Sequence, residues 1–340
     1  MALALLILVA LLGVHVLAAV VATGVIARRI ERANPPGGIF APVAGGRLHL
    51  YDIRPRGPEK GPAILLLHGA TSNARDMVVA LAGRLSEHRR VIAIDRPGHG
   101  WSDRPGGSAD ASPARQADLI AEALGRLGVE RAVVVGHSLA GAAAASLALD
   151  HKDRVAGLVL LAAVTHPWPG GIAWYYRLAA TPVIGRLFVN TVVTPVGAWG
   201  LETAASGSFT PSEGPADYAE ATSAALVLRP DEFRWNSQDV AALKAFVTKQ
   251  AARYHEIDVP CAILASAEDH VVSTAIHARS IARQIEGSRL TVLRGMGHQI
   301  HHAARDIVLA ESERVASASA LDDLGCREPR PRRQGRRDPR

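Results

Sequence analysis

The chain has 340 residues, of which 48% are apolar and 21% are charged, a composition that excludes general disorder. Its length suits a single α/β domain with an insertion. The two cysteines, Cys261 and Cys326, are too few for a disulfide framework, a cysteine-rich zinc site or an iron–sulfur cluster. Cys261 stands in an apolar run, where we expect a buried thiol.

The net charge of +6 is concentrated at the end of the chain. Residues 326–340 contain seven Arg, one Glu and one Asp, a sum of +5, so the other residues together carry +1. No basic face with interleaved aromatic residues is visible in the body, and the sequence therefore predicts no specific nucleic-acid partner. We expect residues 317–340 to form a basic, disordered tail, either simply solvated or weakly attracted to anionic lipid or nucleic acid.

Residues 1–27 contain no Asp, Glu, Lys or Arg, and Arg28, Arg29 and Arg32 follow directly. As a helix, such a run can cross a hydrocarbon core of about 30 Å. We expect a single-pass membrane anchor over residues 1–27, with the main domain in the cytoplasm by the positive-inside rule. The alternative is a cleaved signal peptide and a secreted or periplasmic protein, although the segment lacks the basic residues that precede the apolar run of a signal peptide.

After a linker predicted over residues 28–44, short apolar runs alternate with helical patterns over 45–165 and 256–316. Buried parallel strands are continuously apolar, and strand–helix alternation is typical of a parallel sheet with helices on both faces. The fold class is therefore α/β, and a ligand should lie at the carboxyl ends of the strands. The predicted strands are 46–53 (an edge hairpin strand), 63–67, 91–94, 132–135, 158–161, 262–264 and 290–293, and the predicted helices are 113–127, 138–149, 272–285 and 303–316.

Residues 166–255 interrupt this alternation. They contain no clean strand pattern and hold 12 of the 15 aromatic residues in the chain. We expect an inserted, mainly helical cap over the sheet. Its aromatic side chains either form a small core of their own or line an apolar pocket that faces the site below.

The segment Gly136-His137-Ser138-Leu139-Ala140-Gly141 follows a predicted buried strand and opens a helix. This is the pattern of a nucleophile elbow, with Ala140 where the usual motif has Gly. A sharp strand-to-helix turn strains the serine backbone, and larger side chains at the flanking positions would clash. Ser138 is therefore the candidate nucleophile.

A His-Gly pair, His68-Gly69, follows the strand predicted over 63–67. Such a turn can direct backbone N–H groups at a developing oxyanion, and we expect the N–H groups of Ala70 and Leu139 to do so. His68 is interpreted as a residue that stabilises the turn. Asp95 and His99, in the loop after the next strand, are likewise interpreted as structural.

A serine nucleophile needs a base and a group that orients the base. Asp269 follows a late strand and His298 follows the last one, so with Ser138 they lie at strand carboxyl ends in the order typical of α/β-hydrolases. We expect His298 to act as the base and Asp269 as its partner. Their rivals are neighbours in the sequence: Glu268 for the acid, and His301 and His302 for the base.

Over roughly residues 45–316 these motifs together resemble the α/β-hydrolase superfamily, specifically its capped, serine-nucleophile, esterase- and lipase-like lineage. The resemblance implies an eight-stranded, mostly parallel sheet with a helical cap after its sixth strand. The motifs that carry it are His68-Gly69, the segment 95–102, the elbow 136–141 and the Asp269/His298 pair.

The nucleophile narrows the activity that the resemblance implies. Epoxide hydrolases and haloalkane dehalogenases of this lineage use Asp where this chain has Ser138, and dienelactone-type hydrolases use sulfur. We expect hydrolysis of a carboxylic ester or thioester with a hydrophobic, lipid-like acyl group, without cofactor or metal.

Four alternatives stay open. Carbon–carbon bond hydrolases share the serine triad, although their His-Gly-x-Gly-Pro-Gly loop is replaced here by Ala70-Thr71-Ser72-Asn73. Haloperoxidase-like activity and acyl transfer could use the same triad. The chain could also be a catalytically idle scaffold tethered to a membrane.

Overall fold

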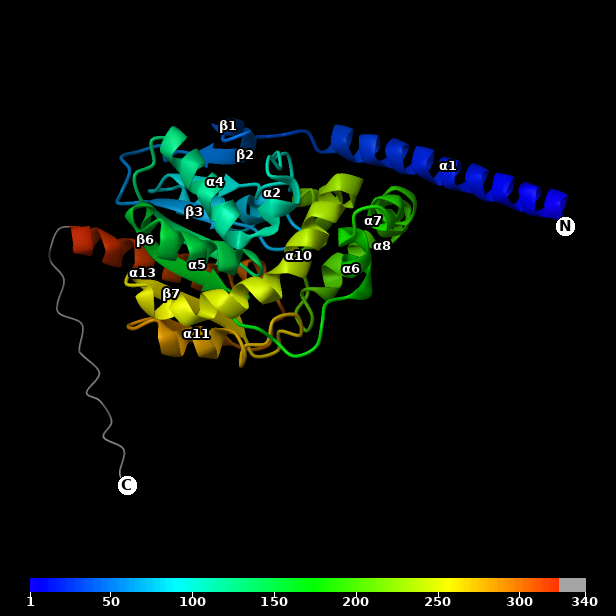
Figure 1. Ribbon diagram of the computed structural model, residues 1–340. Helices are drawn as coiled ribbons and strands as arrows, with labels where there is room; N and C mark the ends of the chain where they lie inside the picture. The colour runs from blue at the N-terminus through cyan, green and yellow to red at the C-terminus, as the bar shows by residue number, and fades with distance from the viewer. Residues whose placement is uncertain (324–340) are drawn as a thin grey trace, which may run out of the picture.

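A computed structural model describes residues 1–323 of the chain (Figure 1). Its centre is an eight-stranded sheet with the strand order β1-β2-β4-β3-β5-β6-β7-β8. The pairs β1–β2 and β2–β4 are antiparallel and all other pairs are parallel, which confirms the predicted fold class. The strands are β1 (Ile39–Val43), β2 (Gly46–Ile53), β3 (Ala63–Leu67), β4 (Val91–Ile94), β5 (Ala132–His137), β6 (Val155–Leu161), β7 (Cys261–Ser266) and β8 (Arg289–Leu293).

Helices cover both faces of the sheet. On one face lie α4 (Pro113–Arg126), α5 (Ala140–Asp150) and α11 (Ala278–Gln284). On the other lie α2 (Ala74–Met77), η1 (Val78–Ala82), α3 (Gly83–Leu85), α12 (Ile300–Ala303) and α13 (Arg305–Asp323). Short 3-10 segments are η2 (Gly107–Ala111) and η3 (Lys152–Arg154).

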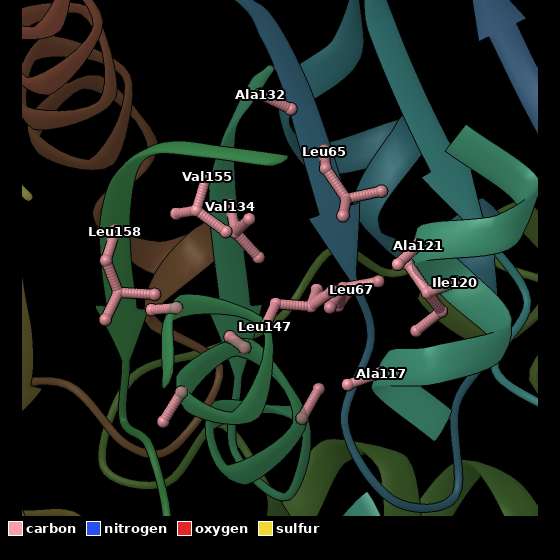
Figure 2. Close-up of a cluster of buried hydrophobic side chains, with 14 of the residues drawn as sticks. Leu65, Leu67, Ala117, Ile120, Ala121, Ala132, Val134, Leu147, Val155 and Leu158 are labelled. Carbon is pink, nitrogen blue, oxygen red and sulfur yellow. The ribbon is translucent and has the colours of Figure 1, made fainter. Parts of the chain in front are cut away.

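Successive residues of each central strand pack on opposite faces. Leu65 and Leu67 of β3 meet α4 and α5, as Figure 2 shows, whereas Ile64 and Leu66 contact the helices of the other face. Because both faces are covered, every position of such a strand is buried, and the sequence is apolar without alternation. This is why the central strands could be located from the sequence. Cys261, at the start of β7, is buried as expected, and burial raises the pKa of its thiol to about 12.

Between β6 and β7 the chain forms the cap, which contains helices and no strand. Its elements are α6 (Trp174–Ala180), α7 (Ile184–Phe188), η4 (Val189–Val193), α8 (Thr194–Gly207), α9 (Tyr218–Ala221), η5 (Ala224–Leu228), α10 (Pro230–Gln250) and η6 (Ala251–Glu256). The cap gathers at one end of the sheet, beside the N-terminal helix α1 (Ala2–Ala33) (Figure 1).

The predicted linker over residues 28–44 was wrong in part, because only residues 34–38 separate α1 from β1. β1 pairs with β2 and forms the edge of the sheet, so β2 is not the edge strand that the sequence predicted. Pro42 fits an edge strand, where an N–H donor is not needed on the outer side. β1 escaped detection because it is short and is flanked by glycines.

Helix α1 is long and apolar enough to cross a membrane, properties that a signal sequence shares. It continues past the predicted end at residue 27 and through the three arginines. Asn34 ends it, since its side-chain amide donates to the carbonyl of Ile30 at 2.9 Å and Pro35 follows. At the other end, α13 extends to Asp323, seven residues into the predicted tail; the remainder of the tail, 324–340, lies outside the described residues.

Gly157 in β6 allows α13 to pack closely on the sheet. A Cβ at this position would overlap Cγ1 of Val315 and lie 3.3 Å from the carbonyl oxygen of Pro260. We predict that Gly157→Ala lowers the free energy of unfolding by about 2 kcal/mol through overpacking. Thermal unfolding should show that Val315→Ala, although destabilising alone, partly rescues Gly157→Ala. Strict additivity of the two changes would contradict this explanation.

Candidate active site

The turn between β5 and α5 holds Ser138 in an unusual backbone conformation. Its φ is +54°, in the left-handed region that residues other than glycine seldom adopt. The conformation is fixed from both sides: the N–H of Ser138 donates to Leu161, and its carbonyl accepts from Gly141 and Val164, all at 2.9–3.0 Å. The side chain is thereby presented above the carboxyl end of the sheet.

Small residues make this turn possible. A Cβ on Gly136 would lie 2.8 Å from Cβ of Ala144, and one on Gly141 would overlap Cβ of Ala163. Ala140, which takes the place of the usual glycine, is completely buried. The residues around the serine therefore match the packing that a nucleophile elbow requires.

Ser138, His298 and Asp269 form one hydrogen-bonded chain. Nε2 of His298 lies 2.8 Å from Oγ of Ser138, and its Nδ1 lies 2.8 Å from Oδ2 of Asp269. A carboxylate accepts only, so Nδ1 carries the proton and Nε2 is left to accept one from the serine. The other oxygen of Asp269 accepts the N–H groups of Val271 and Val272 at 2.8 and 2.9 Å, which fixes the carboxylate.

The rivals of these residues have other contacts. Glu268 accepts the N–H of Gly295 at 3.0 Å and so holds the loop that precedes His298. His301 and His302, on α12, turn away from the serine and contact the buried carboxylate of Asp76, at 3.1 and 2.7 Å. The structure thus brings together the three residues chosen from the sequence and not their neighbours. Their catalytic roles stay predictions.

The expected oxyanion donors lie beside Ser138. Ala70 and Leu139 both line the cavity in front of it, and within residues 1–323 neither N–H has a hydrogen-bond acceptor. The next residue, Thr71, has a φ of +52°, and its N–H donates to Oδ1 of Asn236 on α10 at 2.8 Å. The cap therefore fixes the loop that carries one of the two free N–H groups.

A cavity of about 1270 Å³ lies between the cap and Ser138. The aromatic residues of the cap serve both of the purposes considered from the sequence. Phe188, for instance, packs within the cap itself. Arg279 and His270 also line the cavity, so its wall is apolar but not exclusively so. The aromatic lining residues are Trp168, Tyr175, Tyr176, Tyr218 and Phe233.

The comparisons with known proteins agree with this geometry. A profile of the family described as alpha/beta hydrolase fold matches residues 62–303. An uncharacterised protein of Mycobacterium tuberculosis is 30% identical over 260 residues, 71% of this chain and 71% of that protein. The chain belongs to the α/β-hydrolase family.

Two further similarities bear on the chemistry. The pimeloyl-(acyl-carrier protein) methyl ester esterase of Photorhabdus laumondii is 37% identical over 112 residues, which cover 32% of this chain and 40% of the esterase. The solved structure of Est816, described as an N-acyl homoserine lactone degrading enzyme, has a TM-score of 0.59 and 25% sequence identity. The match covers 80% of this chain and 98% of the Est816 chain. These similarities support hydrolase activity.

Arg96 and Asp239 join the cap of the hydrolase to its core, a contact that the sequence did not indicate. Both side chains are fully buried, with Nη1 of Arg96 2.9 Å from Oδ2 of Asp239 on α10. Arg104 pairs with the same carboxylate at 2.8 Å. No local pattern could have revealed this, because the partners lie more than a hundred residues apart and a polar face on α10 is typical of a solvent-exposed helix.

The residues interpreted as structural are buried around this junction. Nδ1 of His68 lies 2.9 Å from the carbonyl oxygen of Gly69, and its Nε2 accepts the N–H of Arg96 at 3.0 Å. Burial, reinforced by the Arg96 charge, lowers the pKa of His68 to about 3, so the ring is neutral. Asp95 accepts the N–H groups of Ala74 and Trp101. These contacts stabilise the turns on either side of the site.

Asp76 was also missed, and it holds the segment that follows His298. It accepts hydrogen bonds from Ser72 at 2.9 Å and from both His301 and His302. Burial alone would raise the pKa of the Asp76 carboxyl, but the two histidines outweigh burial and hold that pKa well below 3.8. The three groups are close enough to share a metal ion, yet Nε2 of each histidine already meets an oxygen of Asp76. We interpret the cluster as a structural contact that holds α12 against α2.

We predict that Asp76→Asn lowers the free energy of unfolding at pH 7 by about 2 kcal/mol, because the histidines lose an ionised acceptor. A carboxyl whose pKa is depressed by folding stabilises above its unfolded pKa and loses that effect as the pH falls through its folded pKa. The difference in melting temperature between the protein and its variant should thus be present at pH 7 and shrink as the pH falls below about 4, the unfolded pKa of aspartate. A difference that grows below about pH 4 would contradict this role of Asp76.

Proposed function

We propose that this hydrolase cleaves a carboxylic ester or thioester with a hydrophobic acyl group through an acyl-enzyme formed on Ser138. The observation that carries the proposal is the chain Ser138–His298–Asp269 at the wall of a large, mostly apolar cavity. The esterase similarity over 32% of the chain supports the same chemistry.

In the proposed reaction, Oγ of Ser138 attacks the acyl carbon while Nε2 of His298 takes its proton. Asp269 keeps the imidazole in the required tautomer and stabilises the imidazolium that forms. The N–H groups of Ala70 and Leu139 stabilise the tetrahedral oxyanion. His298 then gives its proton to the leaving group and activates a water that releases the acid.

The proposed location of the protein rests on α1. We propose that α1 spans a membrane once, with Arg28, Arg29 and Arg32 on the cytoplasmic side, which places the hydrolase domain in the cytoplasm. A substrate with a long acyl chain would then be available in the adjacent bilayer. The wall of the cavity, with its five aromatic side chains, suits such a chain.

We predict that Ser138→Ala abolishes labelling by a fluorophosphonate and lowers kcat/KM on p-nitrophenyl esters by about four orders of magnitude, because a triad acts as a unit. Ser206→Ala is a matched control, since Ser206 is an exposed serine on α8 outside the cavity lining. Both variants should fold, which circular dichroism can verify. Unchanged labelling of Ser138→Ala would refute the assigned nucleophile. A folded protein that neither labels nor turns over esters would favour the scaffold alternative.

The acyl chain should lie along α8. Gly200 on this helix lines the cavity, and a Cβ there would meet open space. We predict that Gly200→Leu fills part of the cavity, so that kcat/KM falls about tenfold or more for decanoyl and longer esters and little for acetyl esters. The helix itself should tolerate the change, because leucine is a better helix former than glycine. Equal losses for all chain lengths would show that the acyl group lies elsewhere.

A further inference from the structure

Seven large apolar side chains of the cap helices and of the turn after α6 are exposed, and we call this set of side chains the cap face. Val183 is 79% exposed and Trp199 is 92% exposed, although both would normally avoid water. Between Leu178 and Leu201 the sequence has one charged residue, Arg186. The cap face consists of the exposed side chains of α6, of α7, η4 and α8, and of the turn between α6 and α7: Trp174, Val183, Ile184, Leu187, Val192, Val196 and Trp199.

The cap face adjoins the N-terminal helix. α1 contacts η4, α8 and η5, and Figure 1 shows it projecting past the same side of the cap. Ile26 and Ile30 of α1 pack in one cluster with Leu201 and Leu228. The apolar surface of α1 and that of the cap are therefore neighbours.

Polar contacts fix the direction in which α1 leaves the body. Glu31 lies 3.6 Å from the guanidinium of Arg229 at the start of α10. The indole N–H of Trp101 donates to the carbonyl of Asn34 at 3.1 Å. These contacts join the end of α1 to both the cap and the core. The orientation of α1 in a membrane would therefore decide which side of the cap faces the bilayer.

The depth at which the cap meets α1 matches a bilayer boundary. Residues 1–15 are all exposed, and the first fully buried residue of α1 is Thr23, which is 1% exposed. From Ala2 to Thr23 the helix rises by about 32 Å, close to the thickness of a hydrocarbon core. Val16 and Ala19 are partly covered, and Thr23 is the first residue of α1 to be buried, at the depth where a spanning helix would leave the hydrocarbon.

The cap helices themselves have the composition of a membrane segment but not its shape. α6 and the run from Ile184 to Gly207 are together as apolar as a membrane span, yet they bend by 114° at the break between them. A segment with this bend lies along an interface more readily than it crosses a bilayer. Arg177 and Arg186 are exposed on these helices, and Arg28 and Arg29 are exposed on α1, where they can meet anionic headgroups.

We propose that the cap face docks on the bilayer that α1 spans, with Trp199 and its neighbours in the interfacial layer and the exposed arginines at the headgroups. The inference rests on the proposed membrane anchor and does not depend on the proposed chemistry. Tryptophan is the side chain most suited to this layer, because its ring is apolar and its N–H is polar.

The docking would place the cavity at the membrane surface. Gly197, Gly200, Leu201 and Ala204, on one side of α8, line the cavity, whereas Trp199 points outward. Val196 belongs to both surfaces, since it lines the cavity and is 59% exposed. One helix therefore separates the cavity from the cap face, and a lipid-like substrate would have only a short path between bilayer and serine.

Site-specific fluorescence quenching tests the proposal with the full chain. Leu8→Cys, Trp199→Cys and Glu286→Cys, each in a Cys326→Ser background, are labelled with an NBD fluorophore; all three positions are exposed. The proteins are reconstituted in phosphatidylcholine vesicles containing phosphatidylglycerol, either without nitroxide lipids or with lipids that carry a nitroxide at the top of the acyl chain or deep within it. We expect at least about a twofold loss of emission at position 199 and no change at Glu286, which lies on the core beside α11.

The three labels separate the possible failures. Quenching at position 8 by deep nitroxides without quenching at 199 would overturn the docking of the cap while leaving the anchor intact. No quenching at either position would overturn both the anchor and the docking. A blue shift at 199 without quenching would show that another protein copy covers the cap face, which also overturns the proposal. Ester hydrolysis by the labelled proteins, measured in detergent, reports on the proposed function separately.

Discussion

Ser138 has a left-handed backbone between β5 and α5, and the residues around it are those that this conformation permits. Side chains larger than hydrogen at Gly136 and Gly141 would overlap neighbours, and the hydrogen bonds to Leu161, Gly141 and Val164 leave the serine no alternative position. The central parallel strands provide the rigid support for this strain. Because Ser138 is held at the carboxyl edge of the sheet, the loops after β7 and β8 need only place Asp269 and His298 next to it.

Buried polar contacts align the cap with Ser138. Asp239 on α10 meets two buried arginines of the core, and Asn236 on the same helix holds the loop after β3. A buried carboxylate is costly unless it is paired, so α10 has one favourable position over the sheet. Asp76 has the same effect outside the cap. Its contacts with the histidines of α12 hold α12 against α2 and so position the segment that starts at His298. The cavity and the serine are consequently positioned by buried polar contacts of the same kind.

The apolar side chains on the outer side of the cap take no part in these buried polar contacts. Their exposure is costly in water, and their neighbour is a helix with the length and composition to span a bilayer. The proposed docking on lipid removes this cost and explains why polar residues are concentrated on the inner helix α10 of the cap and apolar residues on the outer α7 and α8. In that arrangement lipid would cover the apolar side chains that the cap leaves exposed.

The sequence by itself determined the features that are local. Continuous apolar runs located the central strands, because a strand covered on both faces has no polar side; the elbow, the order of Ser138, Asp269 and His298, and the apolar N-terminal helix are also short-range patterns. Only the tertiary structure decided the contacts between distant segments. β1 became visible through its pairing with β2, Asp76 through the histidines of α12, and Asp239 through Arg96. The physical reason is that a polar residue on a helix is normally expected to face water. Only the folded chain shows where a charged group from a distant segment takes the place of that water.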